Sequence, residues 1–270
     1  MKVIILAGGL GTRLSEETES KPKPMVLIDD NPILWHLMNI FSQQGLHEFV
    51  LALGYRSDVI KRWLLDLNVL DGDITIDTLQ KKVHHLSKGD HYAWKVTALE
   101  TGLNTQTGGR IAQCMKAFPG ERVIATYGDG LANISISKLL AFHESHGKKA
   151  TVTAVRPPAR FGHLHIEGEK VIHFGEKNQA DAGWINGGFF VLEPQVADLI
   201  HSDADAFELT ALPQLAEMGE LMAYAHNGFW QPMDTLREKQ ELGKYALQVP
   251  APWLQGLEDA DSKLTKGVRQ

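Results

Sequence analysis

Residues 2–14 read KVIILAGGLGTRL, and residues 21–25 read KPKPM. The run 3–7 is apolar, carries β-branched residues and has no polar break, which is typical of a strand buried on both faces. Gly8, Gly9 and Gly11 follow this run directly. Because glycine has no Cβ, a ligand can approach the backbone N–H groups closely. A row of such N–H groups after a strand favours the binding of an anion.

Cationic side chains follow this glycine loop. Arg13 offers a planar guanidinium suited to phosphate oxygens, and Lys21 and Lys23 add two ammonium groups. Pro22 and Pro24 fix their own φ and bias their neighbours toward extended backbone, so we expect a stiff segment rather than a helix. The stretch therefore predicts a phosphate-binding loop beside a rigid cationic segment.

Three other interpretations of the glycine loop fit the sequence less well. The dinucleotide fingerprint GxGxxG requires glycine at position 14, where Leu14 stands, although Asp29 and Asp30 lie near the place of its acidic residue. The P-loop requires Gly-Lys followed by Ser or Thr after four spacers, and the sequence contains no such run. A simple turn without a ligand would not require three glycines, an arginine and two lysines between residues 8 and 23.

The composition restricts the class of protein. The 270 residues are 43% hydrophobic and 22% charged, an ordinary balance for a globular chain with a sizeable core. The net charge of −6 argues against general nucleic-acid binding, because a phosphate backbone requires a basic surface. One cysteine excludes an intrachain disulfide, and neither a signal-peptide pattern nor an apolar run of about 18 residues is found. We expect a cytoplasmic protein that binds neither nucleic acid nor membrane.

The rest of the chain alternates between strand and helix patterns. This alternation is typical of an α/β fold with a parallel sheet covered by helices. Strands are predicted at 47–52, 74–77, 96–99, 122–127 and 150–155, with a hairpin over 163–174, and residues 26–28 form a short apolar piece. Helices are predicted at 32–45, 59–67, 135–143, 196–200, 209–218 and 236–246.

Residues 71–110 interrupt this rhythm and are long for a loop. They are interpreted as a lid or a subunit contact. His84 and His85 within them are interpreted as part of a surface strand or partner contact, because a zinc site needs more ligands at set spacing. The segment ends at Thr107-Gly-Gly-Arg110, where a helix start, glycines and an arginine favour an anion. The alternative there is a capped turn with a solvated arginine.

Asp129 stands between two glycines directly after the predicted strand 122–127. The carboxyl end of a parallel strand lies at the sheet edge where ligands bind. Mg²⁺ usually takes one or two carboxylates together with substrate phosphates, so Asp129 is a candidate ligand for this ion. The alternative is that Asp129 only caps the following helix.

The motifs of residues 8–14 and 21–25 resemble the signature of nucleotidyltransferases that make nucleoside-diphosphate sugars. The strings NGGFFV at 186–191 and GFWQPMDTLR at 228–237 are similar, more narrowly, to glucose-1-phosphate cytidylyltransferases. The resemblance extends from Met1 to about Trp253. It implies a Rossmann-like, mostly parallel mixed sheet flanked by helices, with a small β-rich sugar-binding lobe. It also implies one domain over 1–270, with a nucleotide-binding half (1–150), a sugar-phosphate half (151–250) and a C-terminal tail (251–270).

The resemblance further implies a reaction and a set of site residues. CTP and α-D-glucose 1-phosphate would give CDP-glucose and pyrophosphate, with Mg²⁺ held by Asp129 and Asp234. Arg13 and Lys23 are implied to be catalytic, and Thr235 and Arg237 either support Asp234 or begin the next helix. The residues implied to bind the sugar phosphate are Glu176, Lys177, Asn186 and Gly187. Those implied to contact the nucleotide are Leu6, Ala7, Gly8, Gly9, Leu10, Gly11, Thr12, Arg13, Lys23, Thr107, Gly108, Gly109, Arg110, Tyr127, Gly128 and Asp129.

By the same resemblance we expect a homo-oligomer whose product feeds deoxysugars of surface polysaccharides such as O-antigen. Three alternative functions stay open: another pair of nucleotide and sugar phosphate, a glycosyltransferase, or a catalytically silent sugar-nucleotide sensor. The glycine loop and the lone aspartate in 128–130, instead of an Asp-x-Asp pair, argue against a glycosyltransferase. A sensor is expected to have lost at least one of four residues that this chain keeps, namely Arg13, Lys23, Asp129 and Asp234.

Overall fold

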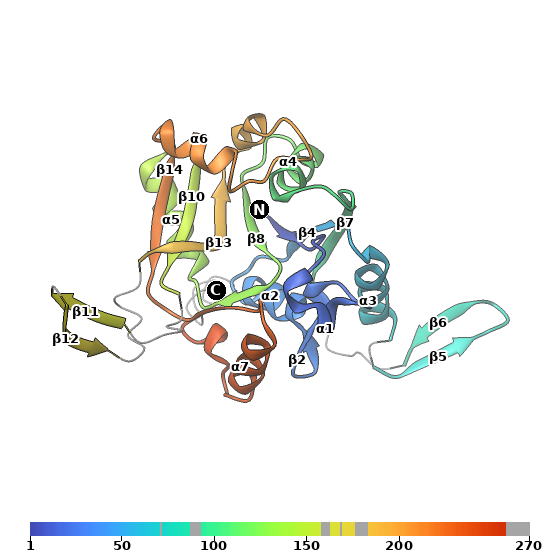
Figure 1. Ribbon diagram of the computed structural model, residues 1–270. Coiled ribbons are helices and arrows are strands. Elements are labelled where there is room, and N and C mark those ends of the chain that lie inside the picture. The colour runs from blue at the N-terminus through green and yellow to red at the C-terminus, as the bar shows by residue number, and fades with distance from the viewer. Residues whose placement is uncertain (71, 87–92, 158–162, 168, 176–182, 258–270) are drawn as a thin grey trace, which may run out of the picture.

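The computed structural model describes residues 1–270 except 71, 87–92, 158–162, 168, 176–182 and 258–270. A seven-stranded sheet forms its centre, in the order β14-β10-β13-β8-β1-β4-β7 (Figure 1). Strand β13 runs antiparallel to both β8 and β10, and the other neighbouring pairs are parallel. The predicted mostly parallel mixed sheet is therefore confirmed. Its strands are β1 (Lys2–Leu6), β4 (Glu48–Leu53), β7 (Lys95–Glu100), β8 (Val123–Tyr127), β10 (Ala150–Val155), β13 (Ile185–Leu192) and β14 (Leu221–His226).

Helices cover this sheet, mostly at the predicted positions. The α-helices are α1 (Ser15–Thr18), α2 (Ile33–Ser42), α3 (Ser57–Val69), α4 (Thr107–Ala117), α5 (Ile136–His146), α6 (Ala211–Glu217) and α7 (Leu236–Ala246). The 3-10 helices are η1 (Thr12–Leu14), η2 (Lys23–Met25), η4 (Pro194–Leu199) and η5 (Pro252–Leu254). The predicted helical segment 196–200 thus falls largely within η4, which begins at a proline. None of the helices in the described part of the chain is both long and apolar enough to cross a membrane.

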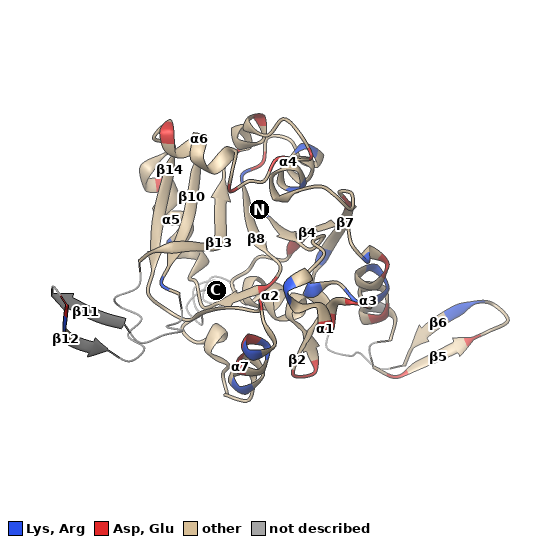
Figure 2. Cartoon of the chain, viewed as in Figure 1, with Lys and Arg blue, Asp and Glu red and all other residues tan. Residues whose placement is uncertain are grey.

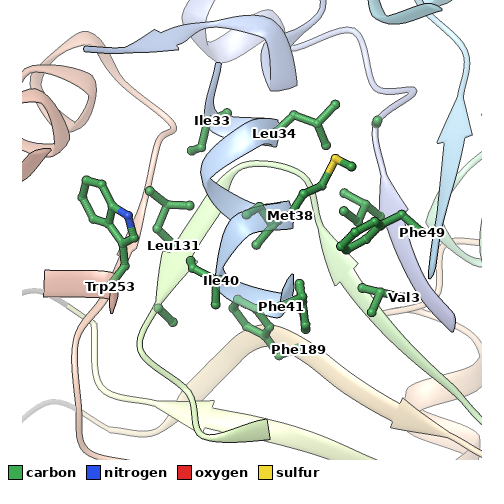
Figure 3. Close-up of a cluster of buried hydrophobic side chains, with 14 of the residues drawn as sticks. Val3, Ile33, Leu34, Met38, Ile40, Phe41, Phe49, Leu131, Phe189 and Trp253 are labelled. Carbon is green, nitrogen blue, oxygen red and sulfur yellow. The ribbon is translucent and has the colours of Figure 1, made fainter. Parts of the chain in front are cut away.

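The two faces of the sheet are buried in two separate apolar clusters. Val3 and Ile5 of β1 belong to the cluster that contains α2, and Ile4 between them belongs to the cluster that contains α4. This division follows from the two-residue period of a strand. Figure 3 shows side chains of the first cluster around α2, with Trp253 on one side of the helix and Phe49 on the other. Burial on both faces explains why β1 has no polar residue after Lys2.

Among the described residues, four small two-stranded sheets lie outside the main sheet. Their strands are β2 (Leu27–Ile28), β3 (Asn31–Pro32), β5 (Ile74–Asp77), β6 (Lys82–His85), β9 (Gly130–Ala132), β15 (Trp230–Pro232), β11 (His163–Glu167) and β12 (Lys170–Gly175). Hairpins β5–β6 and β11–β12 project from the body in Figure 1, and the second is the predicted hairpin over 163–174. Residues 71–110 thus contribute both an exposed hairpin, which ends at His84 and His85, and edge strand β7 of the main sheet.

Strand β14, like the central strand β13, is an element that the sequence did not predict. It pairs in parallel with β10 at the edge of the sheet. Its sequence, LMAYAH, carries two alanines at exposed positions, and its other residues are only half buried. A strand that is not buried on either face gives a weak apolar pattern, which is why it was missed.

Figure 2 shows charges of both signs on α3 and α7, whereas the central sheet carries few charged residues.

Candidate active site

A cavity of about 1290 Å³ opens where β1 and β8 end, at the edge of the sheet where α/β proteins bind ligands. This volume exceeds the roughly 300–1,000 Å³ of a site for one drug-sized molecule, so two substrates can be accommodated together. Most of the site residues predicted from sequence line the cavity. They are Leu6, Ala7, Gly8, Gly9, Leu10, Gly11, Thr12, Arg13, Lys23, Thr107, Arg110, Tyr127, Gly128, Asp129, Asn186, Gly187 and Asp234.

The glycine loop is held by close backbone approaches. A Cβ on Gly8 would lie 2.1 Å from Nη1 of Arg110 and 2.8 Å from the backbone nitrogen of Gly54, so no larger residue fits there without displacement. The carbonyl of Gly8 also accepts a hydrogen bond of 3.1 Å from the Tyr55 amide. Gly9 has open space around it, which leaves its backbone accessible to a ligand.

Four charged side chains, which we call the ion-pair cluster, meet beside this loop: Arg13, Lys23, Asp129 and Asp234. Nζ of Lys23 donates to Oδ2 of Asp129 and to Oδ1 of Asp234, each at 2.6 Å. Nη1 of Arg13 donates to Oδ2 of Asp234 at 2.8 Å. Burial lowers the pKa of Lys23, but the two carboxylates raise it, and the net pKa is raised above its usual value. Lys23 is therefore an ammonium group held between two carboxylates.

Local sequence explains how these residues meet. Pro22 is extended, and η2 then turns the side chain of Lys23 into a site where only 10% of it is exposed. Gly128 lets the end of β8 pass close to β1, because a Cβ there would lie 2.5 Å from the carbonyl oxygen of Leu6. Strands β9 and β15 pair, and the Met233 amide donates to the Asp129 carbonyl at 2.8 Å, which brings Asp234 next to Asp129.

Asp234 is fixed by the start of α7. Thr235 is the N-cap of this helix and forms a capping box with Glu238. The Glu238 carboxylate also accepts from the backbone amide of Asp234 at 2.8 Å. Arg237 bonds Glu241 one turn along the same helix. Thr235 and Arg237 therefore belong to the helix start, which was one of the two interpretations left open by the sequence.

The ion-pair cluster has the donor chemistry of a magnesium site. Two carboxylates face one point, and a cationic nitrogen now stands between them. In the described part of the chain, no group of three or more His, Cys, Asp or Glu side chains is arranged to hold a metal alone. Two carboxylates nonetheless fit Mg²⁺, because substrate phosphates and water supply its remaining ligands. Asp129 does not cap α5, whose N-cap is Ser135.

Arg110 is buried, with 4% of its surface exposed, so the interpretation of a solvated arginine was wrong. It donates to the carbonyls of Gly8 at 3.0 Å and Leu53 at 2.9 Å, and to the Thr101 hydroxyl at 2.6 Å. Burial lowers the pKa of Arg110. Arg110 thus stabilises the glycine loop through its hydrogen bond to Gly8, and it also lines the cavity.

Gly108 and Gly109 lie in the first turn of α4 and face another segment. A Cβ on Gly108 would lie 2.6 Å from the Asp205 carbonyl oxygen, and one on Gly109 would lie 2.7 Å from Cα of Asp203. Neither glycine is among the described residues that line the cavity. Close packing against residues 203–205 explains why glycine stands at both positions. The predicted contact of these two glycines with a nucleotide stays a prediction.

Comparison with known proteins places this geometry in a family. The family described as nucleotidyl transferase matches residues 2–236 of the chain. The chain belongs to the nucleotidyl transferase family. The resemblance inferred from the glycine loop and the Lys-Pro-Lys-Pro segment is thereby confirmed, and so is the predicted fold.

Relatives of this nucleotidyl transferase match along almost their whole length. A glucose-1-phosphate cytidylyltransferase of Salmonella typhi is 47% identical over 256 residues, which are 94% of this chain and 98% of the relative. A probable glucose-1-phosphate cytidylyltransferase of Bacillus subtilis is 43% identical over 254 residues, covering 94% of this chain and 99% of the relative. The crystal structure of HddC from Yersinia pseudotuberculosis complexed with GMP-PN is 25% identical, with a TM-score of 0.67, and covers 90% of this chain and 98% of that one.

Sequence reasoning missed one carboxylate of this nucleotidyl transferase that lines the cavity, Glu208. It accepts hydrogen bonds from the hydroxyl groups of Thr107, at 2.6 Å, and Tyr127. Asn186 joins the same group, because its Nδ2 donates to the Tyr127 hydroxyl at 3.1 Å. Asp203 and Asp205 precede Glu208, but this acidic segment contains no glycine and matches no motif for a binding site, so the sequence does not mark Glu208.

Trp230, also missed, donates from Nε1 to the Gly187 carbonyl at 2.8 Å. Glu176 and Lys177, predicted to bind the sugar phosphate, lie outside the described residues.

Proposed function

We propose that this chain transfers a cytidylyl group from CTP to α-D-glucose 1-phosphate and releases pyrophosphate. The observation that carries the transfer chemistry is the ion-pair cluster, which meets beside an accessible glycine loop in a cavity large enough for two substrates. The choice of substrates is supported by relatives with this printed activity at 47% and 43% identity over almost the whole chain.

The proposed step is an in-line displacement at the α-phosphorus of the nucleotide. An oxygen of the sugar phosphate forms a bond to this phosphorus, and the bond to the bridging oxygen of pyrophosphate breaks. The nucleophile is already ionised, so no covalent intermediate with the protein is needed. The protein has to align two anions and offset their charge, and cationic side chains at the site can do both.

Each member of the ion-pair cluster has a proposed role. The exposed guanidinium of Arg13 would bind the β- and γ-phosphates. Lys23 would leave its carboxylate partners and bind near the α-phosphate, where negative charge develops. Asp129 and Asp234 would hold Mg²⁺, which supplies charge neutralisation on the nucleotide phosphates.

We assign the two substrates to opposite sides of the cavity. The glycine loop and residues 103–107, within the first 150 residues, would bind the nucleotide. Asn186 and Gly187, within residues 151–250, would bind the sugar phosphate through a side-chain amide and backbone groups.

We also propose that the chain forms a homo-oligomer. Hairpin β5–β6 supports this proposal, because Ile76 is 59% exposed and Leu79 is 92% exposed on an element that projects from the body. Exposed apolar groups of this kind are typical of contacts between chains. Light scattering of the purified protein measures the mass directly, and a monomer at working concentration would refute the proposal.

The substrate proposal is tested by pyrophosphate release with Mg²⁺, crossing CTP, UTP, dTTP, GTP and ATP against glucose 1-phosphate and other sugar 1-phosphates. We expect a strong preference for CTP with glucose 1-phosphate. Release with another pair would keep the transfer reaction but reject the cytidylyl assignment. No release with any pair would favour a sugar-nucleotide sensor or a glycosyltransferase.

A further inference from the structure

The carboxylate of Glu208 joins two cavity-lining elements that are far apart in the chain. One of its oxygens accepts from Thr107, the first residue of α4, at 2.6 Å, and the other accepts from the hydroxyl of Tyr127, the last residue of β8. The Thr107 oxygen in turn accepts from the Phe207 amide at 2.9 Å. Both carboxylate oxygens of Glu208 therefore accept hydrogen bonds. The preceding residue, Phe207, is also hydrogen-bonded to α4 through its backbone amide.

The donors and acceptors in this group have only one consistent arrangement. A carboxylate only accepts hydrogen bonds, so the Tyr127 hydroxyl must donate its proton to Glu208. The Tyr127 oxygen can then only accept, and it does so from an N–H of Asn186 at 3.1 Å. At its other end, Oδ1 of Asn186 accepts from the Gly188 amide at 2.8 Å, and a backbone N–H can only donate.

The orientation of the Asn186 amide is thus fixed from two sides. Its nitrogen must face Tyr127 and its oxygen must face Gly188, which leaves one N–H and one oxygen lone pair for a ligand. Gly188 has φ of +78°, and a Cβ there would lie 2.3 Å from the Tyr127 ring, so the ring and this turn are also packed together.

We propose that Glu208 is a positioning residue that acts through Tyr127 to set which atoms Asn186 presents to the sugar of the second substrate. This inference rests on the proposed function, because it assigns Asn186 to the sugar phosphate. Glu208 itself does not contact the substrate in this role. We call Thr107, Glu208, Tyr127 and Asn186 together the hydrogen-bonded chain.

A double-mutant cycle of Glu208→Gln and Tyr127→Phe tests the proposal. Glutamine has the same shape, but an NH2 group replaces one of the two carboxylate oxygens, so the hydroxyl that donates to that oxygen loses its acceptor. We expect each single variant to raise KM for the sugar 1-phosphate about 10-fold, the scale of one lost charge-assisted hydrogen bond, and to raise KM for CTP by a smaller factor, with kcat changed less than about 3-fold. In the Tyr127→Phe background, Glu208→Gln should raise that KM by less than about 2-fold more, since the connection is already broken.

Matched substitutions elsewhere separate positioning from general damage. Glu220→Gln and Tyr224→Phe change the same residue types at positions that are not among the described residues lining the cavity. Both should leave the three kinetic constants unchanged. Additive effects in the cycle, or equal losses in KM for both substrates, would overturn the proposal. A lower melting temperature with unchanged sugar KM would also overturn it, because that is the signature of a merely structural role.

A measurement without turnover keeps this test independent of the proposed function. The side-chain amide signals of Asn186 in a nuclear magnetic resonance spectrum are assigned by their loss in Asn186→Asp. We expect both amide proton shifts to move in Glu208→Gln and in Tyr127→Phe, and to stay in place in Glu220→Gln. Unmoved signals would refute the positioning role, whichever substrates the wild-type protein uses. Moved signals without cytidylyl transfer would keep that role and reject the proposed function.

Discussion

The ion-pair cluster and the hydrogen-bonded chain line the same cavity, but they are built on different principles. In the cluster, Lys23 contacts two carboxylates and Arg13 contacts one of them, so each charge can be exchanged for a phosphate or a metal ion of opposite sign. In the hydrogen-bonded chain, the donors and acceptors between Glu208 and Gly188 admit a single arrangement. From this difference we expect the ion-pair cluster to rearrange when substrates bind, whereas the hydrogen-bonded chain keeps the same geometry with and without substrates.

Loss of either carboxylate should have the largest effect. We expect Asp129→Asn and Asp234→Asn each to lower kcat about 10³-fold or more, because an amide neither holds Mg²⁺ nor offsets its charge as a carboxylate does. The fold should persist, since the backbone of Asp234 is held by the start of α7. Pyrophosphate release measures the effect, and Asp58→Asn on the surface of α3 is the control. Near-normal rates at saturating Mg²⁺ would mean that these carboxylates do not serve the metal.

Substitution of Lys23 tests whether the cluster is exchangeable. We expect Lys23→Met to lower kcat about 10²-fold, the scale for one lost charge-stabilising group. Without nucleotide, the same variant should bind Mn²⁺ more tightly than wild type, because the ammonium no longer occupies the space between the two carboxylates. Paramagnetic resonance titration of Mn²⁺ measures this affinity, with Lys61→Met on α3 as the control. Unchanged or weaker Mn²⁺ binding would show that Lys23 does not compete with the metal.

The two groups also differ in how far the sequence revealed them. Arg13 and Lys23 stand in one stretch of 25 residues, and Asp129 stands between glycines after a clear strand, so local patterns identify three members of the cluster. Glu208 meets its partners across separations of 81 and 101 residues, and a lone glutamate in a polar turn has no local signal. The burial of Arg110 was missed for the same reason, because its partners come from three other segments. Strand patterns predicted most of the fold, but β13 and β14 were not predicted, and β14 gives a weak apolar pattern because it is half exposed.

The glycine loop lies beside the ion-pair cluster, and its neighbouring residues Gly8 and Gly9 can be compared with each other. Gly8→Ala places a Cβ 2.1 Å from Arg110 and 2.8 Å from backbone, so the free energy of unfolding should fall by about 1–3 kcal/mol, the usual range for overpacking. Gly9→Ala meets open space, so that free energy should change by less than about 0.5 kcal/mol. Urea unfolding of both variants gives the comparison. Equal losses would mean that Gly8 is not confined by Arg110.

The smallest effect concerns the far end of the sheet, where neither group lies. His143 is buried there, bonded to Thr151 at 2.8 Å and to Glu193 at 3.1 Å, with Arg122 and Glu144 nearby. Burial first, and Arg122 as well, lower its pKa below 6.5, although Glu193 opposes this shift. As pH falls below 6.5, the unfolded chain therefore takes up a proton that the folded chain resists, and stability is lost.

His143→Gln removes this titration and should flatten the pH dependence of stability. Between about pH 7 and about pH 5.5, we expect the wild type to lose up to about 1 kcal/mol more unfolding free energy than the variant. The lowered pKa of Glu193 contributes stability that is lost only below about pH 4.5, outside this window. Urea unfolding at both pH values measures the difference, and the variant should keep the same KM for both substrates. Parallel pH slopes in the two proteins would show that His143 takes up its proton equally in the folded and unfolded states, and any acid sensitivity of turnover would then have to be sought at the cavity itself.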